Sequence, residues 1–294
     1  MQLPANGLTL EVEDHGSPAG EPLILIMGLG MQLVAWHEGL VAAFVASGFR
    51  VIRFYNRDIG LSQELAHLGT PNLPFQMMRY ALGLPLRPVY TLADLADDTV
   101  GVLDALGLRS AHVCGASMGG MVAQHMALRH PQRVRSLSLI MTTSGSRRLP
   151  QPSWRVRRAL MTRPGSPDDL PSLVARYMAV YRLIGSPAYP TPEAALRQRV
   201  TAALTRSYRP DSVTRQLVAI AADGDRSGWL GRLAVPTQVI HGEDDPLVPP
   251  AAGHDLKARI PGAELDLIPG MGHDLPQELW PRFAANVRLA AGRA

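Results

Sequence analysis

Apolar strand-like runs that alternate with longer helical segments most limit the fold of this chain. The runs PLILIM at 22–27 and SLSLIM at 136–141 are apolar almost throughout, as expected of strands buried on both faces of a parallel sheet. Between such runs lie segments with helical periodicity, such as Met118–Arg129, which His130 and Pro131 end. The alternation predicts an α/β fold with a doubly wound, mostly parallel sheet.

The expected elements fall into two groups, separated by a helical insertion. Strands are predicted at Leu8–Glu13, Pro22–Met27, Arg50–Tyr55, Ala111–Cys114, Ser136–Met141, Thr237–His241 and Glu264–Ile268. Helices are predicted between the strands at Trp36–Ser47, Leu92–Leu106 and Met118–Arg129, and at the end of the chain at Leu275–Ala290. The insertion contains helical patterns at Ser153–Thr162, Leu170–Ile184, Pro192–Thr205 and Asp211–Ala221 and no convincing strand. We therefore expect an α/β core at 1–143 and 222–294 and a helical cap at 144–221.

Composition and charge narrow the function classes. The chain has 294 residues, of which 18% are charged, and a single cysteine, Cys114, which excludes an intramolecular disulfide. The longest apolar run, Leu23–Leu33, is shorter than the roughly 18 residues of a membrane span. Since no secretory signal is visible either, we expect a cytoplasmic protein that does not enter a membrane.

Positive charge is carried almost entirely by arginine. The formal net charge is +4, and Lys257 is the sole lysine. The basic residues are scattered and not interleaved with aromatic ones, so no nucleic-acid binding is expected. The densest cluster is interpreted as a solvated surface, with anion recruitment as the alternative. It comprises Arg147, Arg148, Arg155, Arg157, Arg158 and Arg163.

One serine stands between two glycines where a strand pattern meets a helix pattern. The stretch VCGASMGGM places Ser117 between AHVCG and MGGMVAQHMALRH. Such a sharp turn exposes the hydroxyl at the carboxyl edge of the sheet, and Gly115 and Gly119 give clearance where helix and strand crowd together. The context therefore predicts a nucleophile elbow with Ser117 as the nucleophile.

A base and an orienting acid are expected at two later strand ends. TQVIH runs into GEDDPLVPP, which offers Glu243, Asp244 and Asp245, and AELDLI runs into PGMGHDLP, which offers His273. Both sites lie just past a predicted strand, where open α/β sheets bind their ligands. The order serine, acid, histidine is that of the elbow architecture.

The chain resembles the α/β-hydrolase-fold serine hydrolases, and among them the small esterases similar to aclacinomycin methylesterase. The resemblance covers nearly the whole chain and rests on LILIMGLG, FRVIRFYNRDIGLS, HVCGASMGG, IHGEDDPLVPP and IPGMGHDLP. It implies an eight-stranded sheet with a helical cap. It also places the acid on Asp245, because Gly242 and Val248 flank that residue as in the family pattern G-x-x-D-x-x-V.

The resemblance also implies an oxyanion hole made of the backbone amides of Met118 and Leu29. The family usually has His-Gly where this chain has Met27 and Gly28, and a backbone donor tolerates that change. Two further departures are Tyr55, where the family commonly has Asp, and His37, where Trp36 is normally followed by proline. Both are interpreted as neutral drift, with added polar contacts beside the pocket or deliberate engineering as the alternatives. Candidate pocket residues are Gly28, Trp36, His37, Tyr55, Tyr177 and Tyr181.

Other motifs are weak. A dinucleotide fingerprint beginning at Gly28 fails because its third glycine position is Leu33. The nine histidines form no H-E-x-x-H motif or Cys/His cluster, so no metal is expected. His241 ends a strand and is interpreted as structural, like Cys114.

The predicted function is hydrolysis of small to medium carboxylic esters through a Ser117–His273–Asp245 triad and an acyl-enzyme, without a cofactor. Lactone hydrolysis, perhydrolysis or haloperoxidation, and C–C bond hydrolysis remain alternatives on the same residues. A ligand-binding receptor with a vestigial triad is the non-enzyme alternative. The expected partner is a small-molecule ester, and the expected state is a monomer or homodimer.

Overall fold

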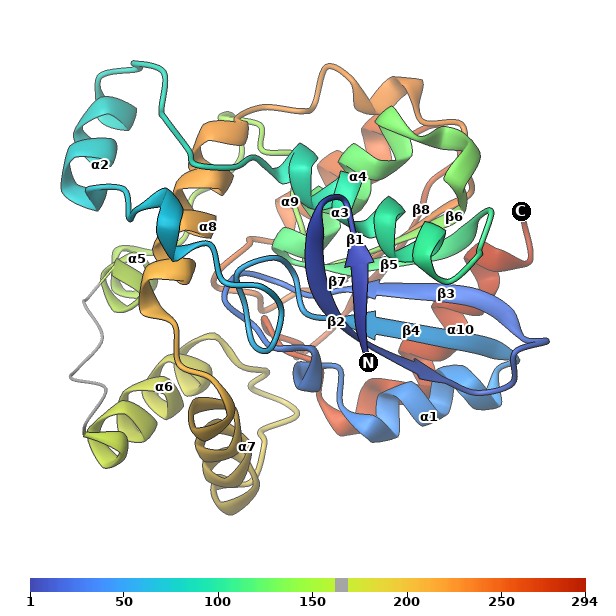
Figure 1. Ribbon diagram of the computed structural model, residues 1–294, viewed down its shortest axis with the longest axis horizontal. Helices are drawn as coiled ribbons and strands as arrows, with labels where there is room; N and C mark the ends of the chain where they lie inside the picture. The colour runs from blue at the N-terminus through green and yellow to red at the C-terminus, as the bar shows by residue number, and fades with distance from the viewer. Residues whose placement is uncertain (162–168) are drawn as a thin grey trace.

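The computed structural model describes residues 1–161 and 169–294, in which eight strands form one sheet (Figure 1). The strands are β1 (Gln2–Ala5), β2 (Leu8–His15), β3 (Glu21–Ile26), β4 (Phe49–Phe54), β5 (Ala111–Ala116), β6 (Val134–Ile140), β7 (Thr237–Gly242) and β8 (Glu264–Ile268). Their order is β1-β2-β4-β3-β5-β6-β7-β8. β2 pairs antiparallel with β1 and β4, and every other pair is parallel. The predicted mostly parallel α/β sheet is confirmed.

Helices cover both faces of this sheet and extend beyond one end of it. The α-helices are α1 (Glu38–Ala46), α2 (Leu73–Ala81), α3 (Leu92–Ala105), α4 (Met118–Arg129), α5 (Trp154–Met161), α6 (Leu170–Ile184), α7 (Glu193–Arg206), α8 (Pro210–Asp223), α9 (Ala251–Arg259) and α10 (Trp280–Ala291). Short 3-10 turns lie at Leu33–Ala35, Ala66–Leu68, Pro131–Arg133, Leu230–Arg232 and Gln277–Leu279.

Alternation along the buried strands builds a core on each face. In β3, Ile24 and Ile26 pack with α3, α4 and α9, whereas Leu23 and Leu25 pack with α1 and α10. All four side chains are fully buried. The sheet therefore has helices on both sides, which accounts for the nearly continuous apolar character of its strand sequences.

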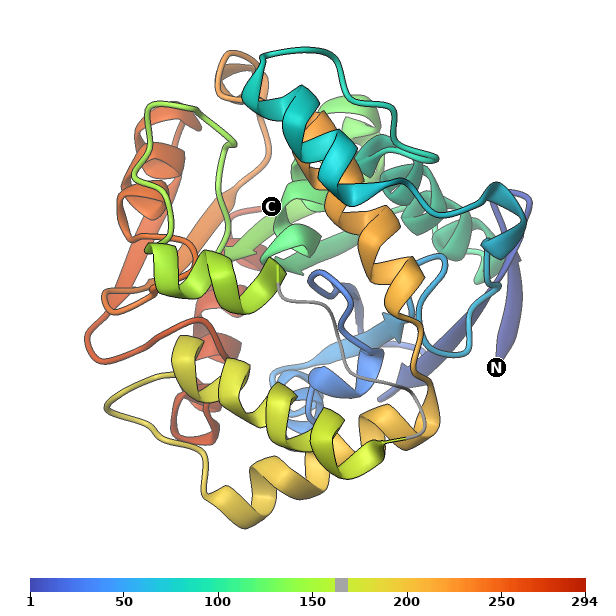
Figure 2. The same cartoon turned by 90° about the vertical axis from the view of Figure 1, so that its left-hand side faces the viewer.

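Among the described residues, the α-helices α5 to α8 lie between β6 and β7. Figure 1 shows α5, α6 and α7 grouped at the lower left, away from the sheet, and α8 running between them and α2. Val174 and Met178 of α6 pack against Leu196 and Val200 of α7 in a small core of their own. α8 packs instead against α2 and α3 (Figure 2), so it links the inserted helices to the sheet's covering layer.

Several predicted boundaries are wrong by a few residues. The helix predicted at Trp36–Ser47 begins at Glu38, because the His37 side chain accepts a hydrogen bond from the Gly39 amide and caps the helix. The helix predicted at Leu275–Ala290 begins at Trp280, after a 3-10 turn. Thr162, predicted to end a helix, lies outside the described residues.

Candidate active site

Ser117 stands alone between β5, which ends at Ala116, and α4, which begins at Met118. Its φ of 55° is in the left-handed region, where non-glycine residues are uncommon. A Cβ on Gly115 would lie 2.3 Å from the Gly119 carbonyl oxygen, and one on Gly119 would lie 2.0 Å from that of Ile26. Both glycines are therefore needed to bring strand and helix together at this turn.

Hydrogen bonds from the neighbouring strand hold this strained turn. The Ser117 amide donates to the Ile140 carbonyl at 2.9 Å, and the Thr142 hydroxyl donates to the Ser117 carbonyl at 2.7 Å. Both partners come from the end of β6 or the residues just after it. The turn geometry is thus fixed by the sheet, and the hydroxyl projects from a rigid base.

Asp245 lies in the tight turn after β7. Its Oδ1 accepts from the Leu247 amide at 2.9 Å and the Val248 amide at 2.8 Å, and its Oδ2 lies 2.7 Å from Nδ1 of His273. The neighbours Glu243 and Asp244 are exposed, and Asp244 accepts from the Gly270 amide instead. Of the three candidate acids, the structure brings Asp245 to the histidine.

His273 follows β8 and completes a chain of hydrogen bonds. Its backbone amide donates to the Ile184 carbonyl at 2.7 Å, at the end of α6. Its Nε2 lies 3.0 Å from the Ser117 hydroxyl. With the Nδ1 proton directed to Asp245, Nε2 has a free lone pair facing Ser117. Asp245, His273 and Ser117 are thus connected in series.

His241 supports the acid's turn. Its Nε2 donates to the Val248 carbonyl at 2.8 Å, and burial lowers its pKa, which keeps the ring neutral. The ring lies 3.7 Å from Oδ2 of Asp245. This placement agrees with a structural role for His241.

Two backbone amides beside Ser117 have no hydrogen-bond acceptor among the described residues. Neither the Met118 amide nor the Leu29 amide donates a hydrogen bond to any residue in 1–161 or 169–294. Met118 is the first residue of α4, whose leading amides have no acceptor within the helix. A Cβ on Gly28 would lie 3.1 Å from the Ser117 Cβ, so the loop that carries Leu29 packs directly against the serine.

The NRDIGLS stretch braces the two loops beside the serine. Asn56 donates to the Met27 carbonyl at 2.9 Å, at the end of β3. Asp58 forms a buried bidentate ion pair with Arg215 of α8, with distances of 2.5 and 2.9 Å. The Ser62 hydroxyl donates to the Tyr55 carbonyl at 2.7 Å. The motif therefore ties the end of β3 and the inserted helix α8 to one loop.

The two unusual residues of these loops both have structural partners. The His37 ring caps α1 and stacks on Trp280 with ring centres 4.6 Å apart. The Tyr55 side chain is buried, and its hydroxyl accepts from Arg206 at 2.9 Å. Trp36 is fully buried in the core beside α1 and α10.

The two predicted cap tyrosines differ in their contacts. The Tyr181 hydroxyl lies 3.1 Å from the sulfur of Met31, so it reaches the loop that follows β3, and burial raises its pKa to about 12. Tyr177 packs beside the small core between α6 and α7. Three polar residues that the sequence motifs did not identify join the inserted helices to the loops near Ser117. Gln216 and Arg206 reach these loops from α8 and α7, and Gln32 reaches α7 from the loop after β3.

The remaining candidates do not gather at the serine. Cys114 is fully buried in β5, and burial raises the pKa of its thiol. Within the described part of the chain, no group of three or more His, Cys, Asp or Glu side chains could hold a metal ion. Nor is any helix in that part long and apolar enough to cross a membrane. Of the predicted arginine cluster, Arg163 lies outside the described residues, and the others are exposed.

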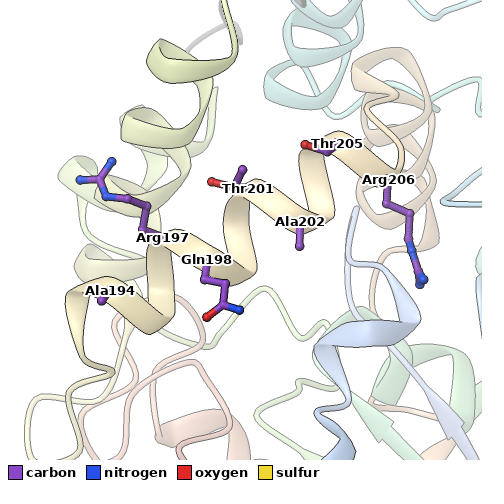
Figure 3. Close-up of a pocket in the computed structure, with 7 residues that line it drawn as sticks. All are labelled: Ala194, Arg197, Gln198, Thr201, Ala202, Thr205 and Arg206. Atoms are coloured by element: carbon purple, nitrogen blue, oxygen red, sulfur yellow. The ribbon is translucent and has the colours of Figure 1, made fainter.

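A shallow pocket lies along one helix and not at the serine. Figure 3 shows its lining side chains, all of them on α7. They are Ala194, Arg197, Gln198, Thr201, Ala202, Thr205 and Arg206. The lining arginine, glutamine, threonine and alanine side chains include no carboxylate or imidazole that could act as a general base, so this pocket offers no chemistry comparable to that at Ser117.

Known proteins resemble the chain over nearly its whole length. Residues 21–276 match the family described as the alpha/beta hydrolase fold. Rhodomycin D methylesterase DauP of Streptomyces sp. (strain C5) is 30% identical over 95% of this chain and 94% of its own. A pimeloyl (acyl-carrier protein) methyl ester esterase of Aromatoleum aromaticum (strain DSM 19018 / LMG 30748 / EbN1) is 29% identical over 85% of this chain and 90% of its own. The crystal structure of a hydrolase from Pseudomonas aeruginosa PA01 superposes with a TM-score of 0.70 at 26% identity, covering 99% of this chain and 98% of that one.

Proposed function

The chain belongs to the α/β-hydrolase family and is an ester-hydrolysing enzyme, and from this premise we propose that it cleaves carboxylic esters through an acyl-enzyme on Ser117. One observation carries the proposal, namely the unbroken hydrogen-bond series from Asp245 through His273 to Ser117. A serine hydroxyl is a weak nucleophile at neutral pH and needs an oriented base. This series supplies one.

The proposed chemistry follows from the orientation of the imidazole. Ser117 Oγ attacks the ester carbonyl carbon while its proton passes to Nε2 of His273. The carboxylate of Asp245 holds the Nδ1 proton and stabilises the imidazolium that forms. The imidazolium then returns its proton to the leaving alcohol. Water, activated by the same histidine, hydrolyses the acyl-enzyme and regenerates the serine.

We propose the Leu29 and Met118 amides as the oxyanion hole. Their lack of partners among the described residues supports this assignment, as does the closeness of Gly28 to Ser117. Fixed donors that face developing negative charge lower the barrier without reorganising during the reaction. The proposed reaction uses no metal or organic cofactor.

We propose methyl esters, or esters of similarly small alcohols, as the substrate class. Two relatives that are about 30% identical to this chain support this, because both are named as methyl ester hydrolases: rhodomycin D methylesterase and the pimeloyl methyl ester esterase. The inserted segment 144–221 would act as a cap and limit the size of the acyl part, with Tyr55 and Tyr181 facing its junction with the core.

The test is a Ser117→Ala variant with Ser17→Ala as its control. Ser17 is exposed in the loop between β2 and β3, before the amino end of β3, whereas Ser117, Asp245 and His273 follow the carboxyl ends of their strands. Both are assayed against methyl and p-nitrophenyl esters, with a lactone and peroxide-dependent halogenation alongside. Ser117→Ala is expected to lose ester turnover while it keeps the wild-type circular dichroism spectrum. A fluorophosphonate should label Ser117 in the wild type. Wild-type turnover by Ser117→Ala would overturn the proposal.

A further inference from the structure

A buried glutamine of α8 holds the loop that follows β3. Oε1 of Gln216 accepts a hydrogen bond from the Gly30 amide at 2.8 Å, although the two residues are 186 positions apart in the chain. Gln216 is fully buried, and its Nε2 has no hydrogen-bond partner among the described residues. A buried unpaired amide costs about 1–3 kcal/mol, so packing alone would favour an apolar side chain here. The hydrogen bond to the Gly30 amide is the contact that glutamine makes here and an apolar side chain could not make.

Val213, one turn before Gln216 on α8, contacts the same glycine. A Cβ on Gly30 would lie 2.9 Å from Cγ2 of Val213, and Gly30 itself has φ +65°. α8 therefore fixes Gly30 in two ways, by a hydrogen bond and by close packing. A loop with glycines at 28 and 30 has wide conformational freedom of its own, so such external contacts determine its shape.

The shape of this loop sets the direction of the Leu29 amide. The Met31 amide donates to the Gly28 carbonyl at 3.2 Å. Because a trans peptide is planar, the Leu29 N–H points opposite to that carbonyl. The Gly30 amide, one peptide further on, is held by Gln216. The peptide that carries the proposed oxyanion donor is thus fixed between two hydrogen bonds.

A second glutamine joins the same loop to α7. Nε2 of Gln32 donates to the Ala203 carbonyl at 2.6 Å and to the Ser207 carbonyl at 2.9 Å. These carbonyls lie at the end of α7, where the Ala203 carbonyl also accepts from the Ser207 amide. Figure 3 shows Arg206, in this last turn, pointing away from Arg197 near the start of the helix. The Arg206 side chain donates a hydrogen bond to the Tyr55 hydroxyl. Both helices that end the insertion are therefore attached to loops beside Ser117.

We infer that Gln216 is a positioning residue for the oxyanion hole, and that through Gln216 and Gln32 the helices α8 and α7 fix the direction of the Leu29 amide. This inference rests on the proposed function above. It makes the inserted helices part of the machinery that stabilises the transition state, in addition to any role in covering the substrate. Gln216 touches no substrate and acts through the backbone of the loop.

The test compares Gln216→Met with Gln238→Met. Methionine keeps the length of the side chain and removes the acceptor, and Gln238 is an equally buried glutamine in β7 whose partner is Arg293. Removing one oxyanion donor costs about 10²–10³ in kcat, so a misdirected donor is expected to lower kcat about 10–100-fold in Gln216→Met. KM should change less than about threefold, because the amide acts mainly in the transition state. Gln238→Met should keep wild-type kcat.

A second readout separates positioning from general loss of structure. A trifluoromethyl ketone forms a hemiketal with the serine, and its oxyanion occupies the hole. Its affinity should fall in parallel with kcat in Gln216→Met, whereas KM for the ester changes little. Gln216→Glu, whose carboxylate can still accept from the Gly30 amide, should recover most of the lost kcat. Should Gln216→Met fail to fold, Gln32→Met, which loosens the loop from α7, is expected to show the same split at smaller amplitude.

The outcomes distinguish the two proposals. The positioning role would be overturned if the wild type is active and both Gln216→Met and Gln32→Met are as active as Gln238→Met. The serine mechanism would then still stand. The positioning role would also be overturned if kcat falls in Gln216→Met while its affinity for the trifluoromethyl ketone is unchanged. A wild type that neither hydrolyses esters nor reacts with a fluorophosphonate would instead overturn the proposed function.

Discussion

The Arg206 guanidinium donates a 2.9 Å hydrogen bond to the Tyr55 hydroxyl, and this contact joins the last turn of α7 to the residue that follows β4. Burial raises the pKa of Tyr55, so the hydroxyl remains neutral and serves as the acceptor. A neutral phenol thus accepts the hydrogen bond from Arg206, and its aromatic ring packs against Gly60.

Replacing Tyr55 with phenylalanine should weaken this junction. The ring keeps its packing, and the hydrogen bond to Arg206 is lost. The free energy of unfolding is expected to fall by about 1 kcal/mol, the usual net value of one such bond, in urea denaturation followed by circular dichroism. Tyr80→Phe is the control, since Tyr80 is exposed on α2. Equal stabilities of the two variants would show that the Arg206 contact contributes nothing.

Asp245→Asn tests which of three consecutive acids orients His273. Asparagine preserves the shape but replaces the carboxylate that accepts from Nδ1. We expect kcat for an ester to drop about 10³–10⁴-fold, as when a triad aspartate is neutralised. Asp244→Asn and Glu243→Gln should stay within about threefold of wild type, since both side chains are exposed and exposed charges couple weakly. A comparable loss in either control would move the acid to that position.

Local patterns predicted the sheet well where strands are buried and poorly at its edge. β1 was not predicted, because QLPA is short, largely exposed and contains a proline, which an edge strand tolerates. α2 was missed because Phe75, Met78 and Tyr80 are exposed, so its apolar residues do not form a single buried stripe. α9 was missed for a related reason, since AAGHDLKAR has few apolar residues.

The positions of Ser117, Asp245 and His273 were predictable because each follows its own strand, and parallel strands bring their carboxyl ends to one edge. The contacts of the loops were not predictable. Gln216 meets Gly30 across 186 residues, and Arg206 meets Tyr55 across 151. No local period or spacing encodes such pairs, because they depend on how α7 and α8 dock. For the same reason His37, considered for the pocket, could not be assigned in advance to capping α1 and stacking on Trp280.

Gly119→Ala should destabilise the fold strongly. The added Cβ would lie 2.0 Å from the Ile26 carbonyl oxygen, and backbone atoms on both sides cannot yield easily. We expect a loss of about 3 kcal/mol or more in urea denaturation, at the upper end of overpacking costs. Gly228→Ala is the matched control, because its Cβ would meet nothing within 4 Å. If both variants unfolded at the wild-type urea concentration, the close approach of α4 to β3 would be refuted.

Acidification should reveal the buried neutral state of His241. Burial is the main cause that lowers its pKa, and nearby His273 and His254 add to the effect, whereas the hydrogen bond to the Val248 carbonyl and the charge of Asp245 oppose it. Since the unfolded chain takes up this proton near pH 6.5 and the folded chain does so at lower pH, the unfolded state binds more protons in that window. The contribution of His241 to stability is therefore present above pH 6.5 and is lost as the pH falls toward the lower folded-state pKa.

His241→Gln isolates this contribution, because the glutamine Nε2 can still donate to the Val248 carbonyl and does not titrate. Below pH 6.5 the wild type should lose stability more steeply than the variant, by up to about 1.4 kcal/mol per pH unit for one proton. His37 and His112, whose pKa values burial also lowers, contribute equally to both proteins. The measurement is the free energy of unfolding in urea at pH values from 7.5 to about 5. Parallel curves for the two proteins over this range would mean that His241 binds its proton equally well in the folded and unfolded states.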